Sequence, residues 1–283
     1  MRISFFFPMV GAMLKVRLIM LRAMCDRVKN PCIRLINKFG TDGGVMRTLE
    51  ILPDVRVTND RCLLLEGGRT AVIGDLHLGY ETALEDEGMF LPRVNTGTIR
   101  DSLNRILSRY EPERMFLLGD IKHDFRRSKH EASSEILEII RLLNEATETI
   151  VIKGNHDNYL QNVLAEEGMS ARDYADVAGY RLEHGHVDSG RRPVIIGHEH
   201  PAVRIPGSGG QKIHCFVLAR KEGVLVIPPF SPMSMGSDLL TEGTVMSPAL
   251  RGSDVGAAEI YGVSDFGIME LGRLLELEKM DAF

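Results

Sequence analysis

Short apolar runs and helical repeats alternate along the chain between residues 63 and 118. Apolar runs at 63–65 and 71–73 flank the turn-forming pair Gly67 and Gly68, and this arrangement predicts a β-hairpin. Further apolar residues recur at helical spacing, which predicts a helix over 95–110 with one apolar face. The apolar run 115–118 predicts a buried strand.

The alternation of helix and strand continues as far as residue 196. Ser128 and Glu131 have the spacing of a capping box and predict the start of a helix, whose apolar residues lie within 136–143. Apolar runs at 149–152 and 194–196 predict two further strands, and a helix is expected over residues 158–166. Strands that alternate with helices favour a mostly parallel sheet.

The pattern changes after residue 210, where three apolar stretches predict antiparallel strands: KIHCFVLA, GVLVIPPF and GIMELGRLLEL. No Pro/Gly-rich linker separates them from the alternating region, so residues 46–283 are expected to form one domain with two sheets. Residues 1–45 are apolar, then basic, and end near TDGG. We interpret this segment as an over-extended start or a loosely attached tail, because Met46 opens a sequence that reads as a natural N-terminus.

Composition and charge limit the class of function. The chain has 283 residues, of which 44% are hydrophobic and 26% charged, as is typical of a globular protein. Its formal net charge is −5, and because residues 1–40 carry +7, the rest of the chain carries −12. An acidic body argues against binding along long duplex nucleic acid, which needs a basic footprint.

The cysteines and the N-terminal run bear on the location of the protein. The four cysteines form no C-x-x-C pair, which favours reduced thiols and a cytoplasmic location. The uncharged run 3–14 is too short to span a bilayer, for which about 20 apolar residues are needed. No stable association with a membrane is therefore expected.

Each apolar strand of the central region ends in residues that bind metals. Seven of the nine histidines lie in these motifs, whereas His130 and His214 do not. Ligands gather beyond the carboxyl ends of strands in open α/β sheets, so the five strand ends are expected to meet at one place. The motifs AVIGDLHLG, MFLLGDIKHD, VIKGNHDN, YRLEHGHVD and VIIGHEH supply Asp75, His77, Asp120, His123, Asp124, Asn155, His156, Asp157, His184, His186, His198 and His200.

The types and spacing of these residues predict a site for two metal ions. Alternate residues of extended backbone face the same side, so Asp75 with His77, and His198 with His200, can reach a common centre. Imidazole, carboxylate and amide ligands without cysteine suit Mn, Fe, Zn, Ni or Co rather than a structural zinc site. The ligands are too many for one ion. Two ions bridged by a carboxylate, about 3.5–4 Å apart, are a recurrent solution for phosphoryl transfer.

The ordered motifs D-x-H, G-D, G-N-H-D, H-G-H and G-H-x-H resemble those of the calcineurin-like metallophosphoesterase superfamily over residues 46–235. DLHLG and GDIKHDF resemble the SbcD-type repair-nuclease branch. The compact length and IPPFSPMSMG resemble small archaeal SbcD-related phosphoesterases. The resemblance implies a four-layer α/β/β/α sandwich with two central mixed sheets. The chain is too short for the DNA-capping domain of full repair nucleases, so double-strand-break processing is not expected.

The resemblance also implies a role for each site residue. His156 would protonate or stabilise the leaving-group oxygen, and Asp157 would orient His156. His123 stands where many members have an acid and would contact the substrate phosphate, with Asp124 as an orienting acid. Two divalent ions, with Mn²⁺ as the first choice, would be held by Asp75, His77, Asp120 and His200 on one side, with Asp120 bridging, and by Asn155, His184 and His198 on the other.

The expected activity is hydrolysis of phosphodiester bonds by water that two metal ions activate, on short or single-stranded nucleic acid or nucleotides. A phosphomonoesterase, a small cyclic-nucleotide phosphodiesterase and a non-catalytic metal-binding scaffold are alternatives. Two features stay open. His186 is equally well a ligand or a neighbour of the site. The basic run that contains Lys122, Arg126, Arg127 and Lys129 is either a solvated loop or a patch that binds substrate phosphate.

Overall fold

The structure is a computed structural model that describes residues 46–89, 92–123, 130–205, 211–240, 245–265 and 267–281. Residues 45–283 form one compact unit. The N-terminal segment 1–45 and the first residue of the predicted capping box, Ser128, lie outside the described residues.

The first sheet contains the predicted hairpin and the first parallel strands. β1 to β4 pair antiparallel, and β4, β5 and β6 pair parallel. The carboxyl ends of these three parallel strands therefore point the same way. In the described part of the chain the sheet has the order β1 (Thr48–Leu52), β2 (Val55–Thr58), β3 (Leu63–Leu65), β4 (Thr70–Ile73), β5 (Arg114–Leu118) and β6 (Glu148–Ile152).

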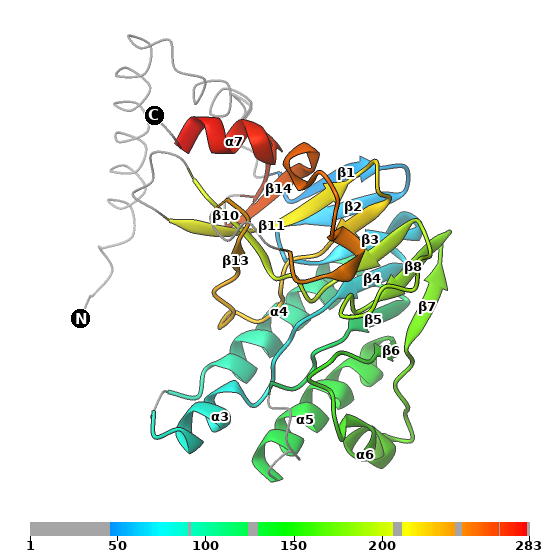
Figure 1. Cartoon of the computed structure of the whole chain (residues 1–283). Helices are drawn as coiled ribbons and strands as arrows, with labels where there is room; N and C mark the ends of the chain where they lie inside the picture. Colours follow the sequence, from blue (N-terminus) through cyan, green and yellow to red (C-terminus); the bar gives the residue numbers. More distant parts are fainter. Residues whose placement is uncertain are drawn as a thin grey trace, which may run out of the picture. The chain divides into compact units, whose positions relative to one another are not determined.

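The second sheet is built from the later strands (Figure 1). β8, β9 and β12 run parallel, and the other pairings are antiparallel apart from the edge pair of β10 with β13. β14 (Glu259–Ser264) pairs with β11 and with β15 (Gly267–Arg273). The order is β13 (Ser237–Asp238), β10 (Pro201–Arg204), β11 (Lys212–Ala219), β12 (Val224–Val226), β9 (Val194–Ile196), β8 (Tyr180–Glu183) and β7 (Tyr174–Val177). The predicted fold class, α/β with two mixed sheets, is confirmed.

The helices follow the predicted pattern with two corrections. α6 begins at Leu160 rather than at 158, because Tyr159 has left-handed backbone. The stretch GIMELGRLLEL is not all strand: β15 ends at Arg273 and α7 starts at once, after Gly272 with a φ of 83°. The α-helices described are α3 (Tyr80–Asp86), α4 (Asn95–Tyr110), α5 (His130–Ala146), α6 (Leu160–Leu164) and α7 (Leu274–Asp281), and the short 3₁₀ turns are η1 (Glu66–Gly68), η2 (Ala165–Glu167), η3 (Pro248–Leu250) and η4 (Val255–Ala257).

Alternation along the central strands divides the core into two layers. Ile73 of β4 and Leu117 of β5 pack in one cluster with apolar residues of α4, α5 and α6. Val72 and Phe116, the neighbours of these residues in sequence, pack in the other cluster with apolar residues of the second sheet. Each central strand of the first sheet is therefore buried on both faces, which explains its continuous apolar sequence. α7 contacts β15 and η4.

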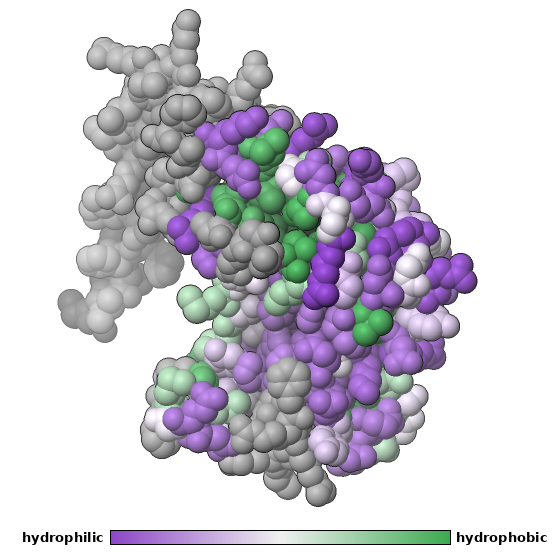
Figure 2. All heavy atoms as spheres, viewed as in Figure 1, coloured by the Kyte–Doolittle hydropathy of each residue, from purple (hydrophilic) through white to green (hydrophobic). Residues whose placement is uncertain are grey.

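The surface is mostly hydrophilic in the view of Figure 2, and hydrophobic residues gather there over β10, β11 and β14. None of the described helices combines the length and the apolar character that a membrane span requires.

Candidate metal centre

The loops that follow β4 and β5 stay hydrogen-bonded to each other beyond the ends of the strands. The N–H of Asp75 donates to the carbonyl of Gly119 at 3.0 Å, and the N–H of His77 donates to the carbonyl of Asp120 at 2.9 Å. This pairing brings the first two sequence motifs side by side. Both loops lie at the edge of the sheet where the parallel strands end, as the sequence predicts.

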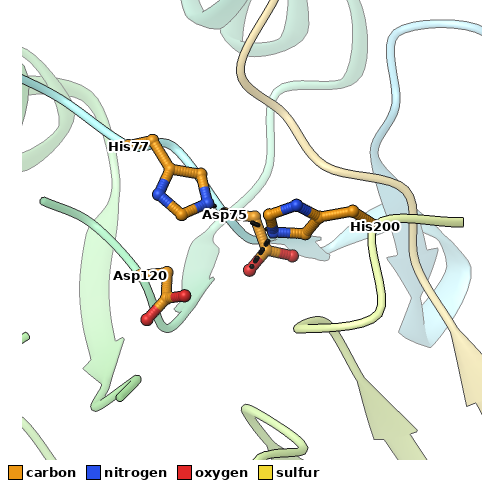
Figure 3. A group of neighbouring side chains, drawn as sticks. All are labelled: Asp75, His77, Asp120 and His200. Atoms are coloured by element: carbon orange, nitrogen blue, oxygen red, sulfur yellow. Dashed lines mark hydrogen bonds and ion pairs between the residues drawn. The ribbon is translucent and has the colours of Figure 1, made fainter. Parts of the chain in front are cut away.

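The first group of converging side chains comes from both sheets (Figure 3). One ligand atom from each of Asp75, His77, Asp120 and His200 lies within 4.8 Å of every other. The Nε2 atoms of His77 and His200 are 3.1 Å apart, and Nε2 of His200 is 3.3 Å from Oδ1 of Asp75. These four residues were expected to converge, and the structure brings all four together.

A second group shares Asp120 with the first. Ligand atoms of Asp120, His184 and His198 also lie within 4.8 Å of one another. Nε2 of His184 is 3.4 Å from Oδ2 of Asp120 and 3.0 Å from the side-chain oxygen of Asn155. Nδ1 of His184 donates to the carbonyl of Leu118 at 2.9 Å, so Nε2 is the ring nitrogen that faces the group.

The backbone is left-handed at five of the candidate ligand residues. Such conformations are uncommon for residues other than glycine and cost on the order of 1 kcal/mol each. The expectation that extended backbone directs the D-x-H and H-x-H pairs is therefore wrong: these residues lie in loops, and His198 and His200 reach different groups. The φ angles run from 47° to 65° at Asp75, His77, Asp120, His198 and His200.

Three glycines allow the loops to approach the side chains of the two groups. A Cβ atom on Gly119 would lie 2.3 Å from Nδ1 of His184, and one on Gly154 would lie 2.2 Å from Oδ1 of Asp120. A Cβ atom on Gly197 would lie 2.7 Å from Oδ2 of Asp75. These distances leave no room for a side chain.

The electrostatics of the site suit a positive ligand. Burial lowers the pKa of His77 to about 3, so this imidazole is neutral and can act as a ligand. Burial also lowers the pKa of His184, but hydrogen bonding to Asp120 and the charge of Asp75 outweigh burial and raise it to about 9. Asp75 is fully buried, and His200 and His184 hold its pKa below the usual value despite its burial. Two buried carboxylates thus require positive charge beside them.

His156 stands beside the residue that both groups share. Its N–H donates to Oδ1 of Asp120 at 2.9 Å, and its Nε2 lies 3.8 Å from Oδ2 of the same carboxylate. Nδ1 of His156 donates to the carbonyl of His123 at 2.5 Å. The rings of His123 and His156 are stacked, with centroids 5.9 Å apart, and Tyr80 packs edge-on against His123.

Asp157 holds the backbone of the site rather than the ring of His156. Its Oδ1 accepts hydrogen bonds from the N–H groups of Ile121 and Lys122, and its Oδ2 accepts one from the N–H of Gly154. The buried carboxylate therefore joins the loops after β5 and β6. The prediction that Asp157 orients His156 is corrected: the ring of His156 donates its hydrogen bond to the carbonyl of His123.

The donor set and its spacing fit divalent metal ions. Donors that bind one octahedral ion at about 2.1 Å lie about 3 Å apart, close to the spacing of the nitrogens of His77 and His200. Nδ1 of His77 is buried and has no hydrogen-bond partner within the described structure, so the ring is held by its Nε2 side. Imidazole and carboxylate together suit Mn, Fe, Zn, Ni or Co.

Comparison with known proteins finds a family to which part of this chain is similar. Residues 68–200 match the calcineurin-like phosphoesterase family. Over these residues the chain is similar to a calcineurin-like phosphoesterase domain. The prediction of a hydrolase that acts on phosphoester bonds is confirmed at this level, and members of this family use divalent metals, for which the domain supplies two groups of Asp and His residues.

A solved structure has a fold similar to that of this chain. The crystal structure of nuclease MPE from Pseudomonas putida matches with a TM-score of 0.59 and 21% sequence identity. The match covers 76% of this chain and 95% of that chain. At this level of sequence identity the match shows only that the two proteins have a similar fold. No curated protein matches the chain.

Other predicted residues lie beside the candidate metal centre or outside the described part of the chain. The ring of His186 packs 5.3 Å from that of His184 but belongs to neither group. Lys122 is buried, so it is not part of an exposed basic patch. Asp124, Arg126 and Arg127 lie outside the described residues.

Two residues near the centre were not expected from the sequence. Ser234 has its hydroxyl 3.2 Å from Nδ1 of His200. Glu199 is buried between the two histidines of GHEH and accepts hydrogen bonds from the N–H groups of Met246 and Ser247. A charged residue between two candidate ligands was the available signal for Glu199, whereas nothing in the sequence pointed to Ser234.

Proposed function

We propose that the protein is a two-metal phosphodiesterase that acts on short or single-stranded nucleic acid or on nucleotides. The observation that carries the proposal is the position of Asp120, which belongs to both groups of candidate ligands and contacts His156. We also propose that residues 46–283 form the catalytic domain and that it is related to the small archaeal SbcD-like phosphoesterases, on the strength of its motifs and compact length.

Each of the two groups of side chains is proposed to bind one metal ion. In the proposal Asp75, His77 and His200 hold one ion, Asn155, His184 and His198 hold the other, and Asp120 bridges them. Two divalent ions, when bound, neutralise phosphate oxygens and lower the pKa of water so that it can attack phosphorus. Manganese is the first choice of metal because the oxygen and imidazole donors suit it.

His156 is proposed to act on the leaving group. The hydrogen bond from Nδ1 to the carbonyl of His123 fixes the ring, so that Nε2 faces Asp120. A proton on Nε2 can then pass to the oxygen of the departing alcohol or stabilise the charge that develops there. His123, whose ring stacks on that of His156, is proposed to contact the substrate phosphate.

Charge supports a small or flexible substrate. Residues 41–283 carry a net charge of −12, which does not favour binding along a long duplex. A single strand or a nucleotide needs few contacts with phosphate. Nuclease MPE of Pseudomonas putida, which shares the fold, is named as a nuclease, and this supports nucleic acid as the substrate class.

A panel of substrates tests the proposal directly. The full chain is assayed with Mn²⁺ on bis-p-nitrophenyl phosphate, p-nitrophenyl phosphate, 2′,3′-cyclic nucleotides and labelled single-stranded DNA. The proposal expects hydrolysis of the diesters and of the DNA, with little on the monoester. A monoester preference would favour a phosphomonoesterase, and no hydrolysis with both metals bound would indicate a scaffold.

Two variants separate the roles of the central residues. Asp120→Asn is expected to abolish hydrolysis and to lower metal content, because the shared carboxylate loses its charge. His156→Ala is expected to slow turnover by about 100-fold or more while the protein retains both ions, because a general acid typically contributes 10²–10⁴-fold. Loss of metal from the His156→Ala protein would show that its proposed role is wrong.

A further inference from the structure

The side chain of Glu199 lies between two candidate ligands but belongs to neither group. It is 1% exposed, and His198 and His200 flank it in the chain. Burying a carboxylate is costly unless hydrogen bonds satisfy its oxygens. Oε1 accepts a hydrogen bond from the N–H of Met246 at 3.0 Å, and Oε2 accepts one from the N–H of Ser247 at 2.8 Å. Glu199 therefore attaches the loop after β9 to a segment that follows much later in the chain.

Ser247 extends this attachment to the loop after β8. Its side chain is fully buried, and its hydroxyl donates a hydrogen bond to the carbonyl of Gly185 at 2.8 Å. Gly185 follows His184, whose ring belongs to the second group of candidate ligands. The φ of Gly185 is 111°, which a residue with a side chain rarely adopts, so the glycine and Ser247 together place this carbonyl. We call Glu199 and Ser247 the Glu–Ser pair.

The loop after β9 needs such an attachment because its backbone is strained. His198 and His200 have φ angles of 65° and 47°, and a left-handed residue other than glycine costs on the order of 1 kcal/mol. This conformation sends His198 to the second group and His200 to the first. Strain of this kind persists only where the surrounding structure fixes the backbone. The two hydrogen bonds of Glu199 fix the residue between the two strained positions.

We propose that Glu199 is a positioning residue for both metal ions and that Ser247 is one for the second ion alone. The inference rests on the proposed two-metal function and names residues that act through the ligands without touching an ion. Glu199 holds one candidate ligand of each group, whereas the hydroxyl of Ser247 holds only the loop of His184. Hydrogen-bonded partners that orient metal ligands typically contribute about 10–100-fold to metal affinity or activity.

Calorimetric titration of the metal-free full chain with Mn²⁺ tests this assignment. The wild type is expected to bind two ions. Glu199→Ala and Glu199→Gln are expected to weaken the binding of both ions about tenfold or more, because alanine makes neither hydrogen bond and the glutamine amide opposes one N–H donor. Ser247→Ala keeps its backbone N–H for Glu199 and loses only the link to Gly185. One dissociation constant should therefore rise about tenfold and the other should stay unchanged.

Hydrolysis of bis-p-nitrophenyl phosphate separates positioning from chemistry. Because Glu199 is proposed to touch neither substrate nor ion, kcat of Glu199→Gln should return close to the wild-type value once Mn²⁺ saturates both groups. The Mn²⁺ concentration that gives the half-maximal rate should rise by the same factor as the dissociation constants. A kcat that stays low while both ions are bound would overturn the proposal.

Glu66→Gln is the matched control. Glu66 accepts a hydrogen bond from the hydroxyl of Thr70 and pairs with Arg114, but these contacts lie at the amino ends of β4 and β5, away from the candidate centre. Its change is expected to lower Tm in EDTA and to keep both Mn²⁺ dissociation constants. Wild-type Mn²⁺ affinities in Glu199→Gln and Ser247→Ala, with only a lower Tm, would overturn the proposal. No binding of Mn²⁺ by the wild type would instead reject the two-metal function.

Discussion

At the scale of the residue, the candidate centre depends on glycines as much as on the residues that can bind metal. Gly119, Gly154 and Gly197 each touch a candidate ligand at a distance that excludes a Cβ atom. The sequence predicts glycine beside the ligands, but it does not show which ligand each one faces. The left-handed backbone at five site residues was not predictable, because it is imposed by pairing between loops that are distant in sequence.

Gly154→Ala is expected to disrupt the centre although the backbone of Gly154 suits any residue. The new methyl group would meet Asp120 and displace the shared carboxylate, so hydrolysis with Mn²⁺ should fall on the order of 100-fold. Gly97→Ala is the control: this position lies in α4 with open space around it, and the change should raise stability by about 0.5–1 kcal/mol. Wild-type activity in Gly154→Ala would contradict the geometry of the centre.

Asp157→Asn separates support of the backbone from catalysis. The carboxylate accepts three backbone hydrogen bonds, and the amide group would set an N–H against at least one N–H donor. Denaturant unfolding should show a loss of about 2 kcal/mol. His156→Ala, at a more exposed position, should lose less than about 1 kcal/mol while its turnover falls. Equal stability of the Asp157→Asn protein and the wild type would restore a purely catalytic role for Asp157.

At the scale of the element, strands with apolar residues on both faces are the most predictable part of the molecule. β5, β6 and β9 lie within one residue of their expected bounds, because their apolar runs are continuous and short. The sequence did not show that β4, β5 and β6 belong to one sheet while β8 and β9 belong to the other, since pairing between distant strands leaves no local pattern. The start of α7 was missed because LLEL reads equally well as strand or helix.

The strands should also protect the two cysteines of the described structure. Cys62 precedes β3 and Cys215 lies in β11; both side chains are fully buried, and burial raises the pKa of each thiol. In a full chain with Cys25→Ser and Cys32→Ser, Ellman's reagent should therefore find no fast-reacting thiol until denaturant is added, and two thereafter. A fast reaction in the native protein would show that the sheets open readily.

At the scale of the whole molecule, the candidate centre links the two sheets. Asp75 and Asp120 follow strands of the first sheet, and His198 and His200 follow a strand of the second. The N–H of His198 donates to the carboxylate of Asp75, so this link exists in the protein itself. An ion bound by both sides would strengthen it.

Metal removal should therefore lower the stability of the whole domain. At a free Mn²⁺ concentration of 100 times Kd, one site adds about 2.7 kcal/mol to the free energy of unfolding. Thermal unfolding with EDTA should give a lower Tm than unfolding with Mn²⁺. The difference in Tm between Mn²⁺ and EDTA should shrink in Asp120→Asn. It should persist in the control Leu275→Ala, which removes an exposed side chain of α7. The same Tm with EDTA and with Mn²⁺ would mean that the groups do not bind this metal in the folded chain.

Because the two sheets share one centre, its first group of candidate ligands can form only at a certain stage of synthesis. The first group needs Asp75 and His200, which are separated by 125 positions, and the strands between them must already pair. A chain emerging from the ribosome cannot complete that group until His200 has been released, although Asp75, His77 and Asp120 appear much earlier. Contacts so distant in sequence form late in folding. We therefore expect a metal ion to bind after the two sheets have paired rather than to nucleate their folding.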